Sequence, residues 1–84
     1  MTAYRPVFDC AAADFLAQLS KRREHKALAL ARDLANHPFK RSDYTLPDDT
    51  GRQIEYLLVE DFVFGYWRDD AVHEFRIVEI QDAS

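Results

Sequence analysis

The sequence predicts an α+β domain in which an N-terminal helical hairpin packs on a small antiparallel β-sheet. The last third of the chain reads as three short strands, at residues 52–59, 62–67 and 72–80, which are separated by tight turns. The stretch before them has the apolar period of helices and almost no strand character. With a short strand at the N-terminus, the expected order of elements is β-α-α-β-β-β.

Length and composition limit the class of protein. A chain of 84 residues is expected to form one domain over residues 1–84, with a small core that a partner or a homodimer contact could complete. Hydrophobic residues make up 48% of the chain, which argues against intrinsic disorder. Cys10 is the only cysteine, and no apolar run is long enough for a signal segment or a membrane span. We therefore expect a cytoplasmic protein that makes no membrane contact.

The N-terminal half contains the predicted edge strand and the helices. Residues 4–8 predict a strand at a sheet edge, because they include a proline that cannot donate a ladder hydrogen bond. Asp9 is a suitable N-cap for a helix over 10–19. Residues 20–24 interrupt the apolar stripe, which resumes over 27–36. Two antiparallel helices fit this pattern, and a single bent helix is the alternative because no Gly or Pro lies in the interruption.

The connection to the sheet and the strand faces are less regular. Residues 37–51 contain two prolines and no sustained period, so they predict a loop that either binds a partner or only joins the two layers. One face of the second strand is predicted to consist of Phe62, Phe64 and Tyr66. Strict alternation on the last strand places His73 with Phe75 and Ile77, opposite Ile80. The helices cover one face, so we expect the other to be partly buried by a partner.

Charge is divided unevenly along the chain. Residues 1–42 carry eight Lys/Arg against four Asp/Glu, a net charge of +4, whereas residues 43–84 carry three against eleven, a net charge of −8. The two halves together give the formal net charge of −4. Because such fields steer association, we expect a charged partner or a polar interface, and an acidic sheet is a poor surface for nucleic acid.

The order of elements resembles the RelE/ParE-like toxins of bacterial toxin–antitoxin modules. In that family a short strand precedes a helix pair similar to residues 13–19 and 28–34, and a Pro-containing loop leads into an antiparallel sheet. A hairpin of the sheet ends in a Tyr-aromatic-x-Asp run that looks like residues 66–70, and the closing strand matches residues 75–80. The resemblance implies the same fold, a bacterial cytoplasmic setting, an antitoxin-like protein partner and no cofactor.

The resemblance also implies cleavage of mRNA, but this chain departs from the family motif at the positions that would carry out the cleavage. Members that cleave mRNA on the ribosome use cationic and aromatic side chains of the sheet, because attack of a ribose hydroxyl on phosphate develops negative charge. The family run Arg-Val-Gly-Asp-Tyr-Arg aligns with residues 58–63, where Leu58 and Val63 replace both arginines, and the usual His-Arg pair is missing from residues 81–84. The implied protein is a toxin, either an mRNA interferase with a rearranged site or a catalytically silent module that binds a protein or homodimerises.

Two sets of residues are candidates for a site. Cations beside Tyr or His suit phosphate binding and acid–base chemistry, and the candidates of this kind are Arg52, Arg68, Arg76, Tyr56 and His73. A cationic run could bind nucleic acid or an acidic partner helix, and it consists of Lys21, Arg22, Arg23 and Lys26. The plainer interpretation of both sets is ordinary solvated side chains. The histidines lack metal-ligand spacing, so no metal site is predicted.

Overall fold

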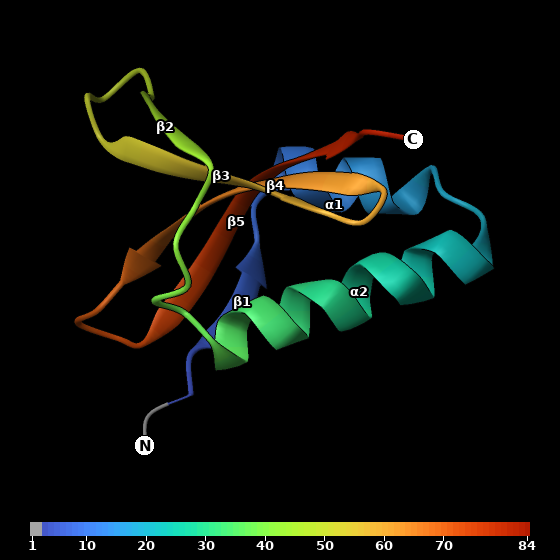
Figure 1. Cartoon of the computed structure of the whole chain (residues 1–84), viewed down its shortest axis with the longest axis horizontal. Coiled ribbons are helices and arrows are strands. Elements are labelled where there is room, and N and C mark those ends of the chain that lie inside the picture. The colour runs from blue at the N-terminus through green and yellow to red at the C-terminus, as the bar shows by residue number, and fades with distance from the viewer. Residues whose placement is uncertain (1–2) are drawn as a thin grey trace.

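A computed structural model describes residues 3–84 of the chain. In this structure a helical hairpin packs on one twisted sheet (Figure 1). The elements in this range are β1 (Arg5–Phe8), α1 (Cys10–Ala17), α2 (Lys21–Asn36), β2 (Tyr44–Pro47), β3 (Gln53–Val59), β4 (Phe62–Asp69) and β5 (Glu74–Asp82). The strand order in the sheet is β1-β5-β4-β3-β2. This arrangement confirms the predicted α+β class. Neither helix of the described chain is long and apolar enough to cross a membrane.

The sheet differs from the prediction in two ways. It is mixed, because β1 runs parallel to β5, with Val7 opposite Arg76. The long connection through the helices and the meander permits this parallel pairing, which a hairpin could not. The segment predicted as a loop also contains β2, which pairs antiparallel with β3 and places Leu46 opposite Ile54. The sequence pattern hid β2 because all four of its residues are exposed, and its proline is tolerated only at a sheet edge.

The helical hairpin is confirmed, with a turn slightly earlier than predicted. Ser20 is the N-cap of α2, and its Oγ accepts a hydrogen bond from the Arg23 backbone N–H at 3.3 Å. The cationic run therefore belongs to the first turns of α2 and not to the connection. Asp9 occupies the N-cap position of α1, but its side chain makes no capping hydrogen bond.

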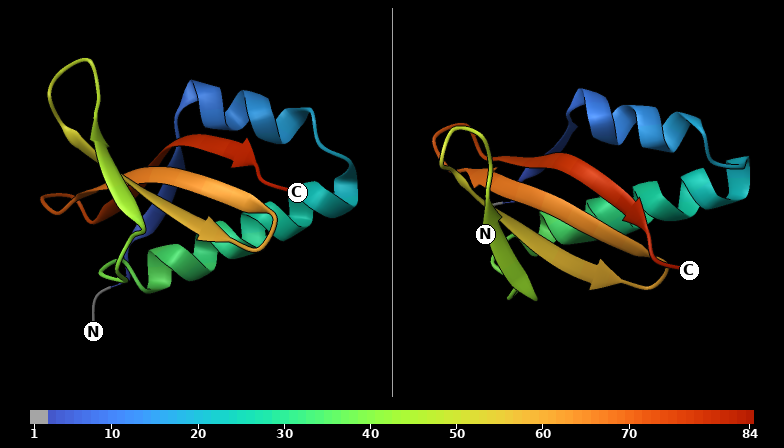
Figure 2. Two further views of the ribbon diagram at one scale, coloured as in Figure 1. Left: turned by 45° about the horizontal axis from the view of Figure 1, so that its top comes forward. Right: turned by 90° about the horizontal axis from the view of Figure 1, so that it is seen from above.

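The core lies between both helices and one face of the sheet (Figure 2). Phe62, Phe64 and Tyr66 are all buried on that face, which confirms their predicted alignment. The buried residues of α2 are mainly alanines, so its backbone can approach the sheet closely. Burial of these large aromatic side chains in so small a domain supplies much of the hydrophobic stabilisation.

The last strand changes phase at a β-bulge. Consecutive residues of β4 pair with Glu79 and Ile77, so Val78 is an extra residue on β5. As a result Ile77 and Ile80 both face the helices and are both buried. The prediction that they lie on opposite faces is wrong, because simple alternation does not account for an inserted residue.

The turn before β5 corrects a second prediction. His73 does not share a strand face with Phe75, since β5 begins one residue later and His73 has a φ of +54° in the turn. The predicted strand over 72–80 is therefore displaced to Glu74–Asp82. The other tight turn, predicted at Glu60 and Asp61, is confirmed, with a φ of +53° at Glu60.

Candidate functional site

We call the face of the sheet that is turned away from the helices the open sheet face (Figure 2). The cross-strand register places on it Tyr44, Leu46, Ile54, Tyr56, Leu58, Val63, Gly65, Trp67 and Arg76. These positions alternate with the core residues of the same strands. The hairpin of β2 and β3 projects away from both helices, so this part of the face is uncovered (Figure 1).

Two of the five candidate catalytic residues meet on Trp67. The guanidinium carbon of Arg52 lies 3.9 Å from the centre of the Trp67 ring, and that of Arg76 lies 5.9 Å from it. Both distances allow a cation–π attraction. A cavity of about 320 Å³ adjoins them, and its acidic lining consists of Asp9, Asp48 and Asp69.

Negative charge outweighs positive charge around this cavity. The Nη2 and Nη1 atoms of Arg76 each lie 2.9 Å from a carboxylate oxygen, of Asp9 and Glu74 respectively. A hydrogen bond from Arg5 lowers the pKa of Glu74, and a hydrogen bond from Arg76 lowers it further. Partial burial acts in the opposite direction but does not cancel these effects. Hydrogen bonds from Thr50 lower the pKa of Asp48. The ion pairs with Asp9 and Glu74 therefore already neutralise the charge of Arg76.

Tyr56 is held by its neighbours on the open sheet face. Its ring stacks on Tyr44 with centres 5.0 Å apart and planes 9° apart, and its hydroxyl donates to Glu79 Oε1 at 3.1 Å. Burial, followed by the hydrogen bond to Glu79, raises the pKa of Tyr56. The ring also lies against Gly65, where an added Cβ would be 2.8 Å from Tyr56 Cε1. A neutral phenol in this position is a hydrogen-bond donor and not a general base.

The remaining candidates lie elsewhere. Arg68 pairs in register with Phe75 on the helix-covered face, and its Nη1 lies 2.9 Å from Glu55 Oε2. The His73 ring lies 5.2 Å from the Tyr4 ring, at the turn before β5. The structure therefore brings together only Arg52 and Arg76 of the three candidate arginines. Among residues 3–84 there is no group of His, Cys, Asp or Glu arranged to hold a metal ion.

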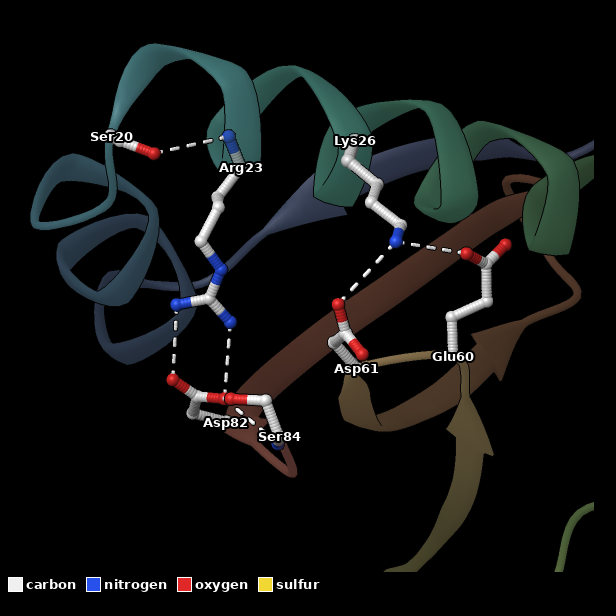
Figure 3. Close-up of polar contacts among 7 residues, drawn as sticks. All are labelled: Ser20, Arg23, Lys26, Glu60, Asp61, Asp82 and Ser84. Carbon is white, nitrogen blue, oxygen red and sulfur yellow. Dashed lines mark hydrogen bonds and ion pairs between the residues drawn. The ribbon is translucent and has the colours of Figure 1, made fainter.

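Two residues of the cationic run of α2, Arg23 and Lys26, make polar contacts within the molecule (Figure 3). The guanidinium of Arg23 donates to both carboxylate oxygens of Asp82, at 3.1 and 3.0 Å. Lys26 Nζ lies 3.0 Å from Glu60 Oε1 and 3.4 Å from Asp61 Oδ2. These pairs join α2 to the β3–β4 turn and to the end of β5.

Half of the predicted cationic surface is therefore already in use. Arg23 also lies over the buried Phe62 ring, 5.1 Å from its centre. Lys21 and Arg22 are exposed, and within residues 3–84 neither makes an ion pair. The sequence could not show this division, since Arg23 and Asp82 are 59 positions apart. The pairing of Lys26 with Glu60 and Asp61 was easier to foresee from residue type, because a cation on a helix is attracted to an acidic turn beside it.

Comparisons with known proteins agree with this fold. No protein-family model matches the chain, and no curated protein is similar to it in sequence. Among solved structures, it is similar to a chain of the RelBE2 toxin–antitoxin complex from Mycobacterium tuberculosis, with a TM-score of 0.77, 19% identity, and coverage of 98% of this chain and 93% of that chain. It is also similar to a chain of the RelE–RelB complex from Pyrococcus horikoshii OT3, with a TM-score of 0.71, 15% identity, and coverage of 99% and 98%.

These likenesses define an α+β domain with a helical hairpin on one side of a mixed sheet. More specifically, the chain has the RelE-like toxin fold over nearly its whole length. The family resemblance seen in the order of the sequence elements is confirmed at the level of the fold.

Proposed function

We propose that this protein is the toxin-like component of a toxin–antitoxin module, and that its open sheet face binds a protein and does not cleave mRNA. The fold supports the first part, since one similar structure is of a RelBE2 toxin–antitoxin complex and the other is of a RelE–RelB complex. The excess of carboxylates over guanidiniums around Trp67 supports the second part.

The chemistry of RNA cleavage requires concentrated positive potential. Negative charge develops on the phosphate during attack by the neighbouring hydroxyl, and positioned cations must stabilise it. The cavity beside Trp67 offers two guanidiniums against three carboxylates, and Arg76 is already paired with Asp9. A phosphate entering this cavity would meet more repulsion than attraction.

The two replaced arginine positions support the same conclusion. Leu58 and Val63 are cross-strand partners on the open sheet face. The resemblance assigns cationic residues to these positions in mRNA-cleaving members, and this chain has an aliphatic pair there. Apolar side chains at this location favour contact with another protein over contact with a phosphate backbone.

One observation favours a second candidate function, an mRNA interferase with a rearranged site. Arg52 and Arg76 lie over the same Trp67 ring, and aromatic side chains with neighbouring cations can bind single-stranded RNA. Arg76 is paired with two carboxylates, whereas Arg52 makes no ion pair within the described residues, so Arg52 is the freer of these two cations to contact a phosphate.

Induced expression in a bacterial host tests both candidates. Growth is recorded together with cleavage of abundant transcripts by primer extension, for the natural sequence and for Arg52→Ala and Arg76→Ala. Arg32→Ala is the matched control, since Arg32 is exposed on α2 and is not among the residues that line the cavity. We expect growth arrest without transcript cleavage, equally in all variants, and relief of the arrest by a small antitoxin-like protein encoded beside this chain.

The other outcomes separate the candidates. Transcript cleavage that Arg52→Ala and Arg76→Ala abolish, and Arg32→Ala preserves, would establish the interferase and overturn the protein-binding assignment. Absence of growth arrest, with the folded protein present at the same level, would overturn the toxin assignment and support the catalytically silent module.

A further inference from the structure

The open sheet face presents a row of exposed apolar side chains along β2 and β3. Tyr44, Leu46 and Leu58 are 49%, 51% and 55% exposed, and the register places all three on this face. Isolated exposed apolar residues are ordinary on a protein surface, whereas a row on one uncovered face indicates an interaction site.

This row rests on a small apolar cluster of its own. Ile54 is only 3% exposed, yet it is not part of the main core between helices and sheet. It pairs with Leu46 on the open sheet face, and the stacked rings of Tyr44 and Tyr56 lie next along the same two strands. The open sheet face of β2 and β3 therefore carries a contiguous apolar platform, in which the exposed side chains lie next to the buried Ile54 and the stacked tyrosine rings.

Acidic side chains border the platform. Asp9, Asp48 and Asp69 line the cavity beside Trp67, and Glu79 lies beside Tyr56. Arg76 is neutralised by its carboxylate partners, and the strand half of the chain carries a net charge of −8. A partner complementary to this border carries positive charge beside an apolar stripe.

The spacing of the apolar residues fits a helix. Side chains on one face of a strand repeat every two residues, roughly 6.8 Å apart. One turn of an α-helix advances about 5.4 Å, and residues i and i+4 are about 6 Å apart along its axis. Three successive levels along β3 carry the apolar side chains: Leu46 lies beside Ile54, Tyr44 lies beside Tyr56, and Leu58 follows. A helix with apolar residues at i, i+4 and i+8 can therefore place one apolar side chain at each level.

Two other occupants fit less well. A second copy of this chain, docked by the same face, would bring the acidic borders together, and like charges across an interface are costly. An added strand would have to pair with β2, which is four residues long and ends at Pro47, a residue without a backbone donor. These features favour a partner that covers the face over one that extends the sheet.

We infer that a basic amphipathic helix of a partner protein lies along β2 and β3 on the open sheet face, with its apolar stripe on Tyr44, Leu46 and Leu58 and its Lys or Arg residues beside the acidic border. The inference rests on the proposed protein-binding function and specifies the chemistry of the partner. This basic partner helix has the opposite charge to the acidic partner helix that the cationic run of α2 would bind.

The test uses a synthetic probe and needs no toxicity assay. A fluorescein-labelled Leu/Lys peptide of about 18 residues, with leucines on one helical face, is titrated with the protein by fluorescence polarisation. A peptide with Glu in place of Lys and a scrambled Leu/Lys peptide are the probe controls. The protein variants are Leu46→Asp and Leu58→Asp, with Val72→Asp as matched control, because Val72 is 58% exposed in the β4–β5 turn.

The sign of the effect separates the inference from simple charge attraction. If the apolar stripe is the contact, Leu46→Asp and Leu58→Asp weaken binding of the amphipathic Leu/Lys peptide at least tenfold. If only charge matters, the added carboxylate strengthens binding. We expect the Val72→Asp protein to bind as the natural sequence does, and the Glu and scrambled peptides to bind at least tenfold more weakly.

Further measurements remain decisive if a variant fails to fold. Amide chemical-shift changes in the natural sequence on adding the Leu/Lys peptide are expected on β2 and β3, and changes confined to α1 and α2 would overturn the inference. Equal binding of the Glu peptide, or equal loss in Val72→Asp, would also overturn it. A dimer in sedimentation equilibrium that Leu58→Asp dissociates would assign the face to a second copy. All these results are independent of whether expression arrests growth.

Discussion

Gly65 is the position where a single added methyl group tests the architecture of the open sheet face. Gly→Ala at a permissive site stabilises a protein by about 0.4–1 kcal/mol, because it reduces the conformational freedom of the unfolded chain. At Gly65 the added Cβ would lie 2.8 Å from Tyr56 Cε1 and 3.3 Å from Cδ1 and Cζ. Real Cβ atoms do not approach carbon this closely, so the Tyr56 ring must move away.

The cost of that movement follows from what holds the ring. Displacement weakens the stacking of Tyr56 on Tyr44, worth about 0.5–1.5 kcal/mol, and the hydrogen bond to the Glu79 carboxylate, worth about 1.5–3 kcal/mol before allowance for solvent. After the favourable entropy is subtracted, we expect Gly65→Ala to destabilise the protein by about 1–2 kcal/mol. For a domain of this size each kcal/mol lowers Tm by roughly 4–8 °C.

A double-mutant cycle isolates this contact. In a Tyr56→Ala background the obstacle is gone, so Gly65→Ala is expected to stabilise by about 0.5 kcal/mol, which gives a coupling free energy of roughly 1.5–2.5 kcal/mol. Urea unfolding is followed by circular dichroism and by the emission of Trp67, the only tryptophan. If Gly65→Ala stabilises both backgrounds by the same amount, the close contact of Tyr56 with Gly65 is refuted.

Two pH-dependent predictions follow from the shifted pKa values. Hydrogen bonds from Arg23, then Ser84, lower the pKa of Asp82 far below its ordinary value, so its contribution to stability is complete above the unfolded pKa of about 3.9 and declines progressively as pH falls below it. Asp82→Asn should therefore lower Tm more at pH 6 than at pH 2, and Asp14→Asn, at an exposed position of α1, is the matched control. Burial, aided by the negative charge of Glu55, raises the pKa of Tyr66 to about 12, so its contribution is complete below pH ~10 and is lost as pH rises toward 12. Tyr66→Phe should reduce the fall of Tm over that range, with Tyr44→Phe as the control at an exposed ring; an equal effect of both substitutions would contradict the role of burial.

The candidate site could be predicted only in part. Arg52 and Arg76 could be identified as candidate site residues because residues 43–84, which form most of the sheet, contain only three Lys/Arg. Their meeting on Trp67 was not, because it depends on β3, β4 and β5 lying side by side in one register. The separation of Arg68 from them has the same origin, since one position along β4 decides which face a side chain occupies.

Local sequence patterns were sufficient to predict the helical pair, the β3–β5 meander and the aromatic core face of β4, because the apolar period records which side of an element is buried. They were also sufficient to show the resemblance to RelE/ParE-like toxins, since that rests on the order of elements. The parallel pairing of β1 with β5, the exposed strand β2 and the bulge at Val78 became visible only in the folded structure. These features depend on contacts between residues distant along the chain, and so do the ion pairs that occupy Arg23 and Lys26.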